Sequence, residues 1–264
     1  MTIQREFIKI MEIEDFISEE EINYILSSCI KFKRSKIVNG EMNEDISHIT
    51  TSEFSSVDLD VRSSESAKMN RDFHYGETSI NIKKRVSKII NVNWLNIENL
   101  GVIKYNEGEE YKTHMDCWIP NTSAYKEQIK NGGQRIYTCL IYLNDDFSGG
   151  ETEFINANIK IIPKKGKAVF WNHLRNIGNC DGVVSDDYNL PNILSCHSGN
   201  PVKKGIKYAC NIFVREKNFP MSKNPPTNTN YIEEDTADLI EYKPKIVTTH
   251  NILHTHSVYH IMNP

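Results

Sequence analysis

His114 and Asp116 carry the most informative chemistry in this sequence of 264 residues. They are two residues apart, so in an extended strand both side chains would leave the same face. An imidazole beside a carboxylate is part of a site for a divalent first-row metal, and two histidines with one carboxylate leave coordination positions open. Such a pair also arises by chance in a chain with nine histidines, so a third ligand is needed to make it a metal site.

His197 is the strongest candidate for that third ligand. It ends an apolar run and precedes the turn signal Gly199-Asn200-Pro201. Lys207 follows ten residues later, which places it on a neighbouring antiparallel strand, where its charge would suit the distal carboxylate of a metal-chelated dicarboxylate. The other histidines lack a supporting pattern. We interpret His48, His74 and His173 as surface or packing residues, and His250, His254, His256 and His260 as a polar tail in preference to a second metal site.

The middle of the chain consists of short apolar runs separated by turn residues. The runs are 100–105, 135–143, 152–155, 159–162, 167–171, 193–196 and 206–214. Many short strands with regular turn signals are typical of an all-β sandwich or barrel such as a jelly roll. Two helices are expected before it, one after the capping box of Ser18 and Glu21 and one over Ile82, Val86 and Ile89. The predicted fold is mainly β (α+β), with the N-terminal helices packed on the β core.

Lys207 poses a problem for this interpretation. Residues 206, 208, 210, 212 and 214 form the more apolar face of the last strand, and Lys207 shares the other face with Ala209, Asn211 and Phe213. Alternation alone points Lys207 to solvent. It would point inward only if the interior of the barrel is a polar cavity.

Composition narrows the function classes. A net charge of -4 and a pI of about 6.2 give no basic surface for nucleic acid. No apolar run reaches the length of a membrane span, and residues 1–16 lack the pattern of a secretory signal, so we expect a cytoplasmic protein without membrane contacts. Six scattered cysteines without zinc-type spacing indicate free thiols. We divide the chain into a helical and loop support region (1–98), a β core (99–216) and a C-terminal extension or tail (217–264).

Residues 100–216 resemble the collagen-type prolyl 4-hydroxylases within the Fe(II)/2-oxoglutarate dioxygenase superfamily, with weaker similarity at 61–64 and 15–20. The matching motifs occur in the order of the family. They are Tyr105-Asn106-Glu107-Gly108, Tyr111 with His114-Met115-Asp116, Gly132-Gly133-Gln134-Arg135-Ile136, Leu140-Ile141-Tyr142-Leu143-Asn144-Asp145, Gly149-Gly150-Glu151-Thr152-Glu153-Phe154, Pro163 with Gly166-Lys167-Ala168, His197 through Lys207, and Arg215-Glu216.

The resemblance implies a double-stranded β-helix (jelly-roll) core in which His114, Asp116 and His197 hold Fe(II). It implies that Lys207 pairs with the C5 carboxylate of 2-oxoglutarate, which favours the polar cavity. Tyr105 and Thr152 match positions that hydrogen-bond the same co-substrate. Arg62 and Arg135 match positions that contact a peptide substrate. One departure is that Asn211-Ile212-Phe213 stands where many members have Lys-Trp, and Phe213 has no N–H to donate.

The function implied is a 2-oxoglutarate-dependent non-haem iron dioxygenase, a procollagen-proline 4-dioxygenase-like enzyme. It would hydroxylate a proline-containing peptide or protein with O2, release succinate and CO2, and use ascorbate as a reductant. Two alternatives stay open, a hydroxylase of a free amino acid or other small molecule and a non-catalytic binding module of the same fold. A mobile loop at 39–60 closing over an open groove would favour the peptide, and a sealed pocket the small molecule. The sequence leaves the substrate, its regiochemistry and the oligomeric state undetermined.

Overall fold

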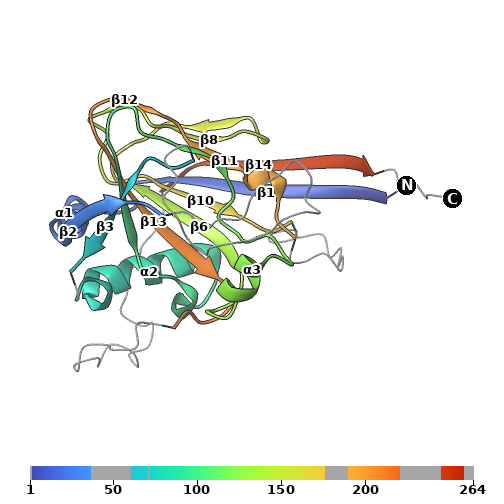
Figure 1. Ribbon diagram of the computed structural model, residues 1–264, viewed down its shortest axis with the longest axis horizontal. Helices are drawn as coiled ribbons and strands as arrows, with labels where there is room; N and C mark the ends of the chain where they lie inside the picture. The colour runs from blue at the N-terminus through green and yellow to red at the C-terminus, as the bar shows by residue number, and fades with distance from the viewer. Residues whose placement is uncertain (1, 37–60, 71, 176–189, 221–244, 259–264) are drawn as a thin grey trace.

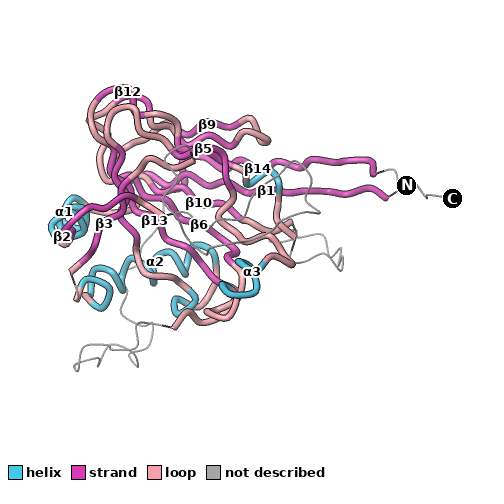
Figure 2. Tube along the Cα trace, in the orientation of Figure 1, coloured by secondary structure: helices cyan, strands magenta, loops and turns pink. Residues whose placement is uncertain are grey.

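The computed structural model describes residues 2–36, 61–70, 72–175, 190–220 and 245–258, which form two facing antiparallel sheets with helices on one side. The larger sheet has eight strands in the order β14-β1-β10-β6-β13-β4-β3-β2, and the smaller has the order β5-β11-β8-β9. Figure 2 distinguishes the strands from the helices along the chain. The bounds of the larger sheet are β1 (Thr2–Glu14), β2 (Cys29–Arg34), β3 (Glu65–Met69), β4 (Gly101–Tyr105), β6 (Arg135–Tyr142), β10 (Ala168–Asn172), β13 (Lys207–Arg215) and β14 (Lys245–Val258). Those of the smaller sheet are β5 (Tyr111–His114), β8 (Thr152–Phe154), β9 (Ile159–Ile161) and β11 (His197–Gly199), and β7 (Ser148–Gly149) pairs with β12 (Val202–Lys204).

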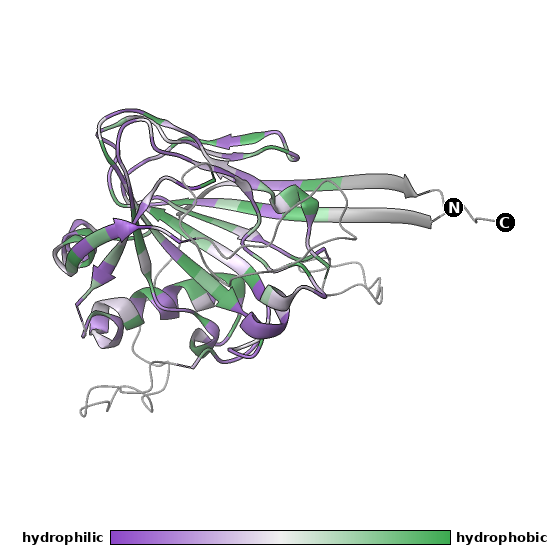
Figure 3. Ribbon diagram, viewed as in Figure 1, coloured by the Kyte–Doolittle hydropathy of each residue, from purple (hydrophilic) through white to green (hydrophobic). Residues whose placement is uncertain are grey.

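The central strands β10, β6 and β13 of the larger sheet are largely buried on both faces, which explains why they are strongly apolar (Figure 3). One face packs under α1 (Glu19–Ser27) and α2 (Glu77–Ile90), and the other packs against the smaller sheet (Figure 1). On β13, Cys210, Ile212 and Val214 belong to the cluster under the helices, whereas Ala209 belongs to the cluster between the sheets. Lys207 lies on the Ala209 side and is buried. The orientation predicted from alternation alone, with Lys207 facing solvent, is therefore wrong, because a strand buried on both faces has no solvent side.

Both expected helices are confirmed. The side chain of Ser18 accepts from the backbone N–H of Glu21, and the Glu21 carboxylate accepts from the N–H of Ser18, which completes the predicted capping box. Both helices contribute to the cluster under the helices, through Ile22 and Ile25 of α1 and Ile82 and Val86 of α2. A short helix α3 (Ser123–Gln128) and the 3₁₀ turns η2 (Phe73–Tyr75), η3 (Trp94–Asn96) and η4 (Ile193–Ser195) complete the described helices.

We expect Ser18→Ala to lower the free energy of unfolding by about 1 kcal/mol, because it removes the cap of α1. In a chain of this size that loss corresponds to a fall in Tm of about 2–4 °C. Thermal unfolding followed by circular dichroism measures it. Ser27→Ala at the exposed far end of the same helix is the matched control and should leave Tm within error. Equal effects of the two substitutions would contradict the capping interpretation.

The two ends of the chain differ from the expectation. Residues 2–14, which the sequence left unassigned, form β1, and Lys245–Val258 of the expected tail forms β14, which pairs with β1 in antiparallel register (Figure 1). On β1, Ile8 and Ile10 are buried on one face and Met11 and Ile13 on the other, so the strand shows no polar alternation. Strand β14 is polar and its partner lies more than 230 residues away, so local pattern carried no signal.

The larger sheet thus combines strands from all three regions into which we divided the sequence, although the boundaries themselves stay predictions. The run 193–196, expected as a strand, forms η4 and leads into β11. The loop at 39–60 lies outside the described residues, as do His48, His260 and Cys180. The other five cysteines are free thiols, and no described helix is long and apolar enough to cross a membrane.

Candidate metal centre

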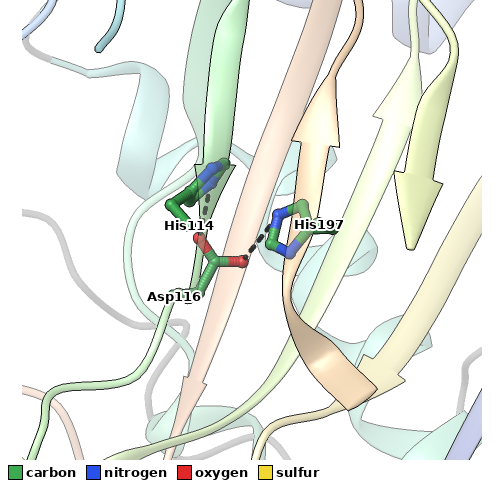
Figure 4. Close-up of side chains that lie close together, drawn as sticks. All are labelled: His114, Asp116 and His197. Atoms are coloured by element: carbon green, nitrogen blue, oxygen red, sulfur yellow. Dashed lines mark ion pairs between the residues drawn. The ribbon is translucent and has the colours of Figure 1, made fainter. Parts of the chain in front are cut away.

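Two strands of the smaller sheet and the turn that follows one of them bring His114, Asp116 and His197 together. His114 ends β5, His197 begins β11, and the two residues are partners in the antiparallel register of these strands. Asp116 lies just beyond the end of β5. The Nε2 atom of each histidine lies 3.6 Å from a different carboxylate oxygen of Asp116. All three ligand atoms lie within 4.8 Å of one another, and the three side chains point toward one another (Figure 4).

Backbone carbonyls orient both imidazoles. The Nδ1 atom of His114 lies 2.8 Å from the carbonyl oxygen of Lys112, and that of His197 lies 2.9 Å from the carbonyl of Ser195. Each Nδ1–H therefore donates to a carbonyl, which leaves the Nε2 lone pair directed at Asp116 and free to bind a metal. Two imidazole nitrogens and one carboxylate are the donor set suited to Fe(II) in an open site.

Burial and neighbouring charges keep two of these side chains in the protonation states that a metal requires. Burial alone would raise the pKa of Asp116, but the imidazoles of His197 and His114 lower that pKa well below its usual range. The pKa of His197 is lowered to about 4, mainly by burial and to a smaller extent by the neighbouring His114. At neutral pH the carboxylate is ionised and His197 is neutral, so no proton has to leave before a divalent cation binds.

The three side chains line a pocket of about 350 Å³, its open mouth included, between the two sheets. Its other lining residues are Ile103, Tyr105, Tyr111, Leu140, Thr152, Trp171, Ser198, Gly199, Lys207 and Asn211. The predicted co-substrate residues Tyr105, Thr152 and Lys207 are therefore in the same pocket as the predicted ligands. Tyr111, to which no role was assigned from the sequence, stacks on the ring of His114 with the ring centroids 3.5 Å apart.

Lys207 is a buried cation that lacks an anionic partner. Its ammonium donates to the carbonyl oxygen of Gly150 at 2.7 Å, and no carboxylate of the described residues forms an ion pair with it. Burial lowers the pKa of Lys207 to about 8, and Glu151 opposes this shift from a distance. A buried charge without a counter-ion is costly. The pocket therefore suits a ligand that brings a carboxylate to Lys207, as 2-oxoglutarate would.

The two predicted substrate residues lie outside the pocket lining. The guanidinium of Arg62 lies 4.7 Å from the ring centroid of Tyr111, on the margin of the pocket. Arg135 donates from Nε and Nη2 to the two carboxylate oxygens of Glu98, at 2.8 and 3.0 Å, and from Nη1 to the backbone carbonyl of Asp116 at 3.3 Å. Arg135 thus braces the turn that carries Asp116. Contact with substrate stays a prediction for both arginines.

We expect Glu98→Gln to destabilise the chain by about 3–5 kcal/mol, because it leaves Arg135 and Arg215 buried together without their shared counter-charge. Chemical denaturation monitored by fluorescence measures the loss. Glu65→Gln, which breaks the more exposed pair with Lys104, is the matched control and should cost at most about 1 kcal/mol. A Glu98→Gln variant as stable as the wild type would show that Arg135 and Arg215 do not depend on the charge of Glu98.

Two residues that lie against the carboxylate of Asp116 were not predicted from the sequence to belong to the site. The hydroxyl of Thr138 on β6 lies 2.7 Å from Oδ2 of Asp116 and 2.7 Å from Nε2 of His173. His173 is fully buried, and burial lowers its pKa to about 3. Its side chain lies in the interior, as a packing residue would, and it contacts the candidate metal centre through Thr138. Its position depends on the pairing of β6 with β10, which no local pattern reveals.

The comparisons with known proteins agree with this geometry. The model of the 2OG-Fe(II) oxygenase superfamily matches residues 100–215. A protein of Acanthamoeba polyphaga mimivirus, provisionally named a prolyl 4-hydroxylase, is 37% identical over 138 residues, 52% of this chain and 53% of that protein. Prolyl 4-hydroxylase subunit alpha-2 of Caenorhabditis elegans is 27% identical over 231 residues, covering 87% of this chain and 38% of that protein.

Among solved structures, the viral collagen prolyl hydroxylase of Paramecium Bursaria Chlorella virus-1, in its 2OG complex, matches with a TM-score of 0.53 and 23% identity. The match covers 78% of this chain and 95% of that one, and it shows that the two share a fold. The expected jelly-roll core is confirmed. The chain spans about half the length of the mimivirus relative and 38% of the nematode one. Residues 100–215 thus match the 2OG-Fe(II) oxygenase superfamily, and the chain is similar in sequence to prolyl 4-hydroxylases.

Proposed function

We propose that the chain is an Fe(II)- and 2-oxoglutarate-dependent dioxygenase that hydroxylates prolyl residues of a peptide or protein. The observation that carries the proposal is the pocket in which His114, Asp116 and His197 converge opposite a buried cation, Lys207, that has no counter-ion among the described residues. When bound, Fe(II) supplies the oxidative chemistry, in which one atom of O2 enters succinate, the other enters the substrate, and CO2 leaves.

The residues of the chain would bind and orient the reactants. The two histidines and Asp116 hold the metal, and Lys207 neutralises the distal carboxylate of the co-substrate. The hydroxyl of Thr152 lies 2.7 Å from that of Tyr142, so it is held in the pocket wall beside the same carboxylate site. The Tyr105 ring lies 5.1 Å from the Lys207 ammonium and shields it from solvent. Excluding water strengthens the attraction between Lys207 and its anion.

A peptide is favoured over a small molecule because the curated relatives are named prolyl 4-hydroxylases, with collagen in the name of the structural neighbour. The direct test supplies the chain with Fe(II), 2-oxoglutarate, ascorbate and air, and measures succinate release and the gain of one oxygen atom in the substrate. The substrates are a (Pro-Pro-Gly)n peptide, poly-L-proline, an alanine-substituted control peptide and free proline.

Each outcome decides between the alternatives. Oxygen gained by the proline peptides alone supports the proposal, whereas oxygen gained by free proline alone supports the small-molecule hydroxylase. If neither succinate nor hydroxylated product forms under any condition, the result supports the binding module. Omitting ascorbate should reduce the number of turnovers before activity is lost, if it is the reductant.

A cytoplasmic location also stays a prediction, which fractionation of the source cells tests.

A further inference from the structure

Two side chains from separate elements, Thr138 and His173, meet at the inner side of Asp116. Thr138 projects from the middle of β6, where its register partner is Trp171 of β10. His173 follows β10 directly, and its backbone N–H donates to the carbonyl of Ile136 at 2.9 Å, which continues the pairing with β6. Thr138 and His173 are 1% and 0% exposed. Their contact with each other and with Asp116 is therefore fixed by the main sheet rather than by the turn that carries Asp116.

The directions of the hydrogen bonds follow from the donors available. The ionised carboxylate of Asp116 can only accept, so the single hydroxyl proton of Thr138 points to Oδ2, across 2.7 Å. The oxygen of Thr138 must then accept from His173, which carries its proton on Nε2, also across 2.7 Å. The bonds run in one direction from His173 through Thr138 to Asp116. Hydrogen bonds aligned in this way polarise and strengthen one another.

Packing alone does not account for His173. Its Nδ1 atom is buried without a hydrogen-bond partner among the described residues. A phenylalanine ring would fill the same space beside Trp171 without leaving a polar atom unsatisfied. Within the part of the chain that the structure describes, the His173 side chain makes one polar contact at hydrogen-bond distance, the one with Thr138. The imidazole therefore costs stability at this position and acts on the threonine.

We propose that Thr138 and His173 form a positioning relay that fixes the carboxylate of Asp116 for metal binding. The inference rests on the proposed function, in which Asp116 is a ligand. Asp116 lies beyond the end of β5, so strand pairing does not hold its side chain. The relay connects that side chain to β6 and β10, two neighbouring strands of the larger sheet. Thr138 is the contact with the ligand, and His173 acts through Thr138.

Metal binding without turnover tests the relay. The affinity of the full chain for Mn(II) is measured without O2 by the electron paramagnetic resonance signal of free Mn(II). We expect Thr138→Val to weaken binding by about 10- to 100-fold, the usual cost of losing a partner of a metal ligand. Thr138→Ser keeps the hydroxyl and should restore the wild-type affinity. Thr122→Val, at the cap of α3 and away from the pocket, is the matched control and should lower stability without changing affinity.

A substitution at His173 distinguishes the relay from a purely structural role. His173→Phe should weaken Mn(II) binding by about 2- to 5-fold through the weaker Thr138 hydrogen bond, while Tm stays level or rises. In the Thr138→Val background it should have no further effect on affinity, because the relay is already broken. A purely structural role would instead lower Tm and affinity together, and would add to the effect of Thr138→Val.

The outcomes separate the relay from the proposed function. Wild-type affinity in Thr138→Val, with binding lost in Asp116→Ala, overturns the relay and leaves the metal site standing. Unchanged affinity in Asp116→Ala overturns the ligand set itself. If Thr138→Val does not fold, His173→Phe decides alone, and a wild-type affinity in that variant overturns the relay.

Discussion

Replacing Asp116 with alanine is expected to abolish both Mn(II) binding and succinate formation. The carboxylate is the only anionic group of the described residues in the three-ligand cluster, and the oxygens that face His114 and His197 disappear with it. Two neutral imidazoles attract a divalent cation far less than two imidazoles and a carboxylate. The loss should exceed the roughly 10- to 100-fold that follows removal of an outer partner of a ligand.

The measurement pairs metal affinity without O2 with succinate release under air, so that binding and turnover are followed separately. Asp72→Ala, an exposed aspartate at the start of η2, is the matched control and should behave as the wild type. His197→Ala should reproduce the loss seen in Asp116→Ala. An Asp116→Ala chain that released succinate at the wild-type rate would show that the metal is held elsewhere.

The three candidate ligands, which the structure brings together, were predictable from the sequence because their chemistry is local. The spacing of His114 and Asp116 and the turn after His197 are visible in short windows, and the order of motifs connected them. The central strands were predicted for the same reason, since their apolar runs end at Gly, Pro or Asn residues. The face of Lys207 was not predictable from alternation, because the pattern of a strand buried on both sides does not distinguish a core face from a pocket face.

The features that could not be predicted from the sequence depend on contacts between distant segments of the chain. The pairing of β1 with β14 joins residues near opposite ends of the chain, and neither strand has a simple alternation. Thr138 and His173 meet Asp116 only because β6 and β10 are neighbours and the turn after β5 lies against them. Arg135 matched a substrate position by motif, yet its charge is matched by Glu98 inside the protein. A motif identifies a position, and the neighbours of that position decide what its side chain can contact.

Lys207→Ala is expected to weaken 2-oxoglutarate binding by about 100- to 4000-fold, while Mn(II) affinity stays within error of the wild type. Removing one member of a buried ion pair costs about 3–5 kcal/mol, and each 1.4 kcal/mol is a tenfold change in affinity. Calorimetric titration of the Mn(II)-loaded chain with 2-oxoglutarate measures the loss. Lys204→Ala, an exposed lysine on β12, is the matched control and should bind as the wild type.

The pH dependence of the same titration identifies the charge as the cause. The pKa of Lys207 is lowered to about 8 in the chain without ligand, so raising the pH from 7 to 9 removes its proton and with it the attraction for the carboxylate. Wild-type affinity should therefore fall by about tenfold over this interval, since one proton must be taken up for each anion bound above the pKa. The pKa of His197, at about 4, lies too low to contribute to this change. The Lys207→Ala chain has no proton to lose at this position, so its weak affinity should stay flat between pH 7 and 9. An equal decline in both chains would assign the pH dependence to another group and remove Lys207 from the co-substrate site.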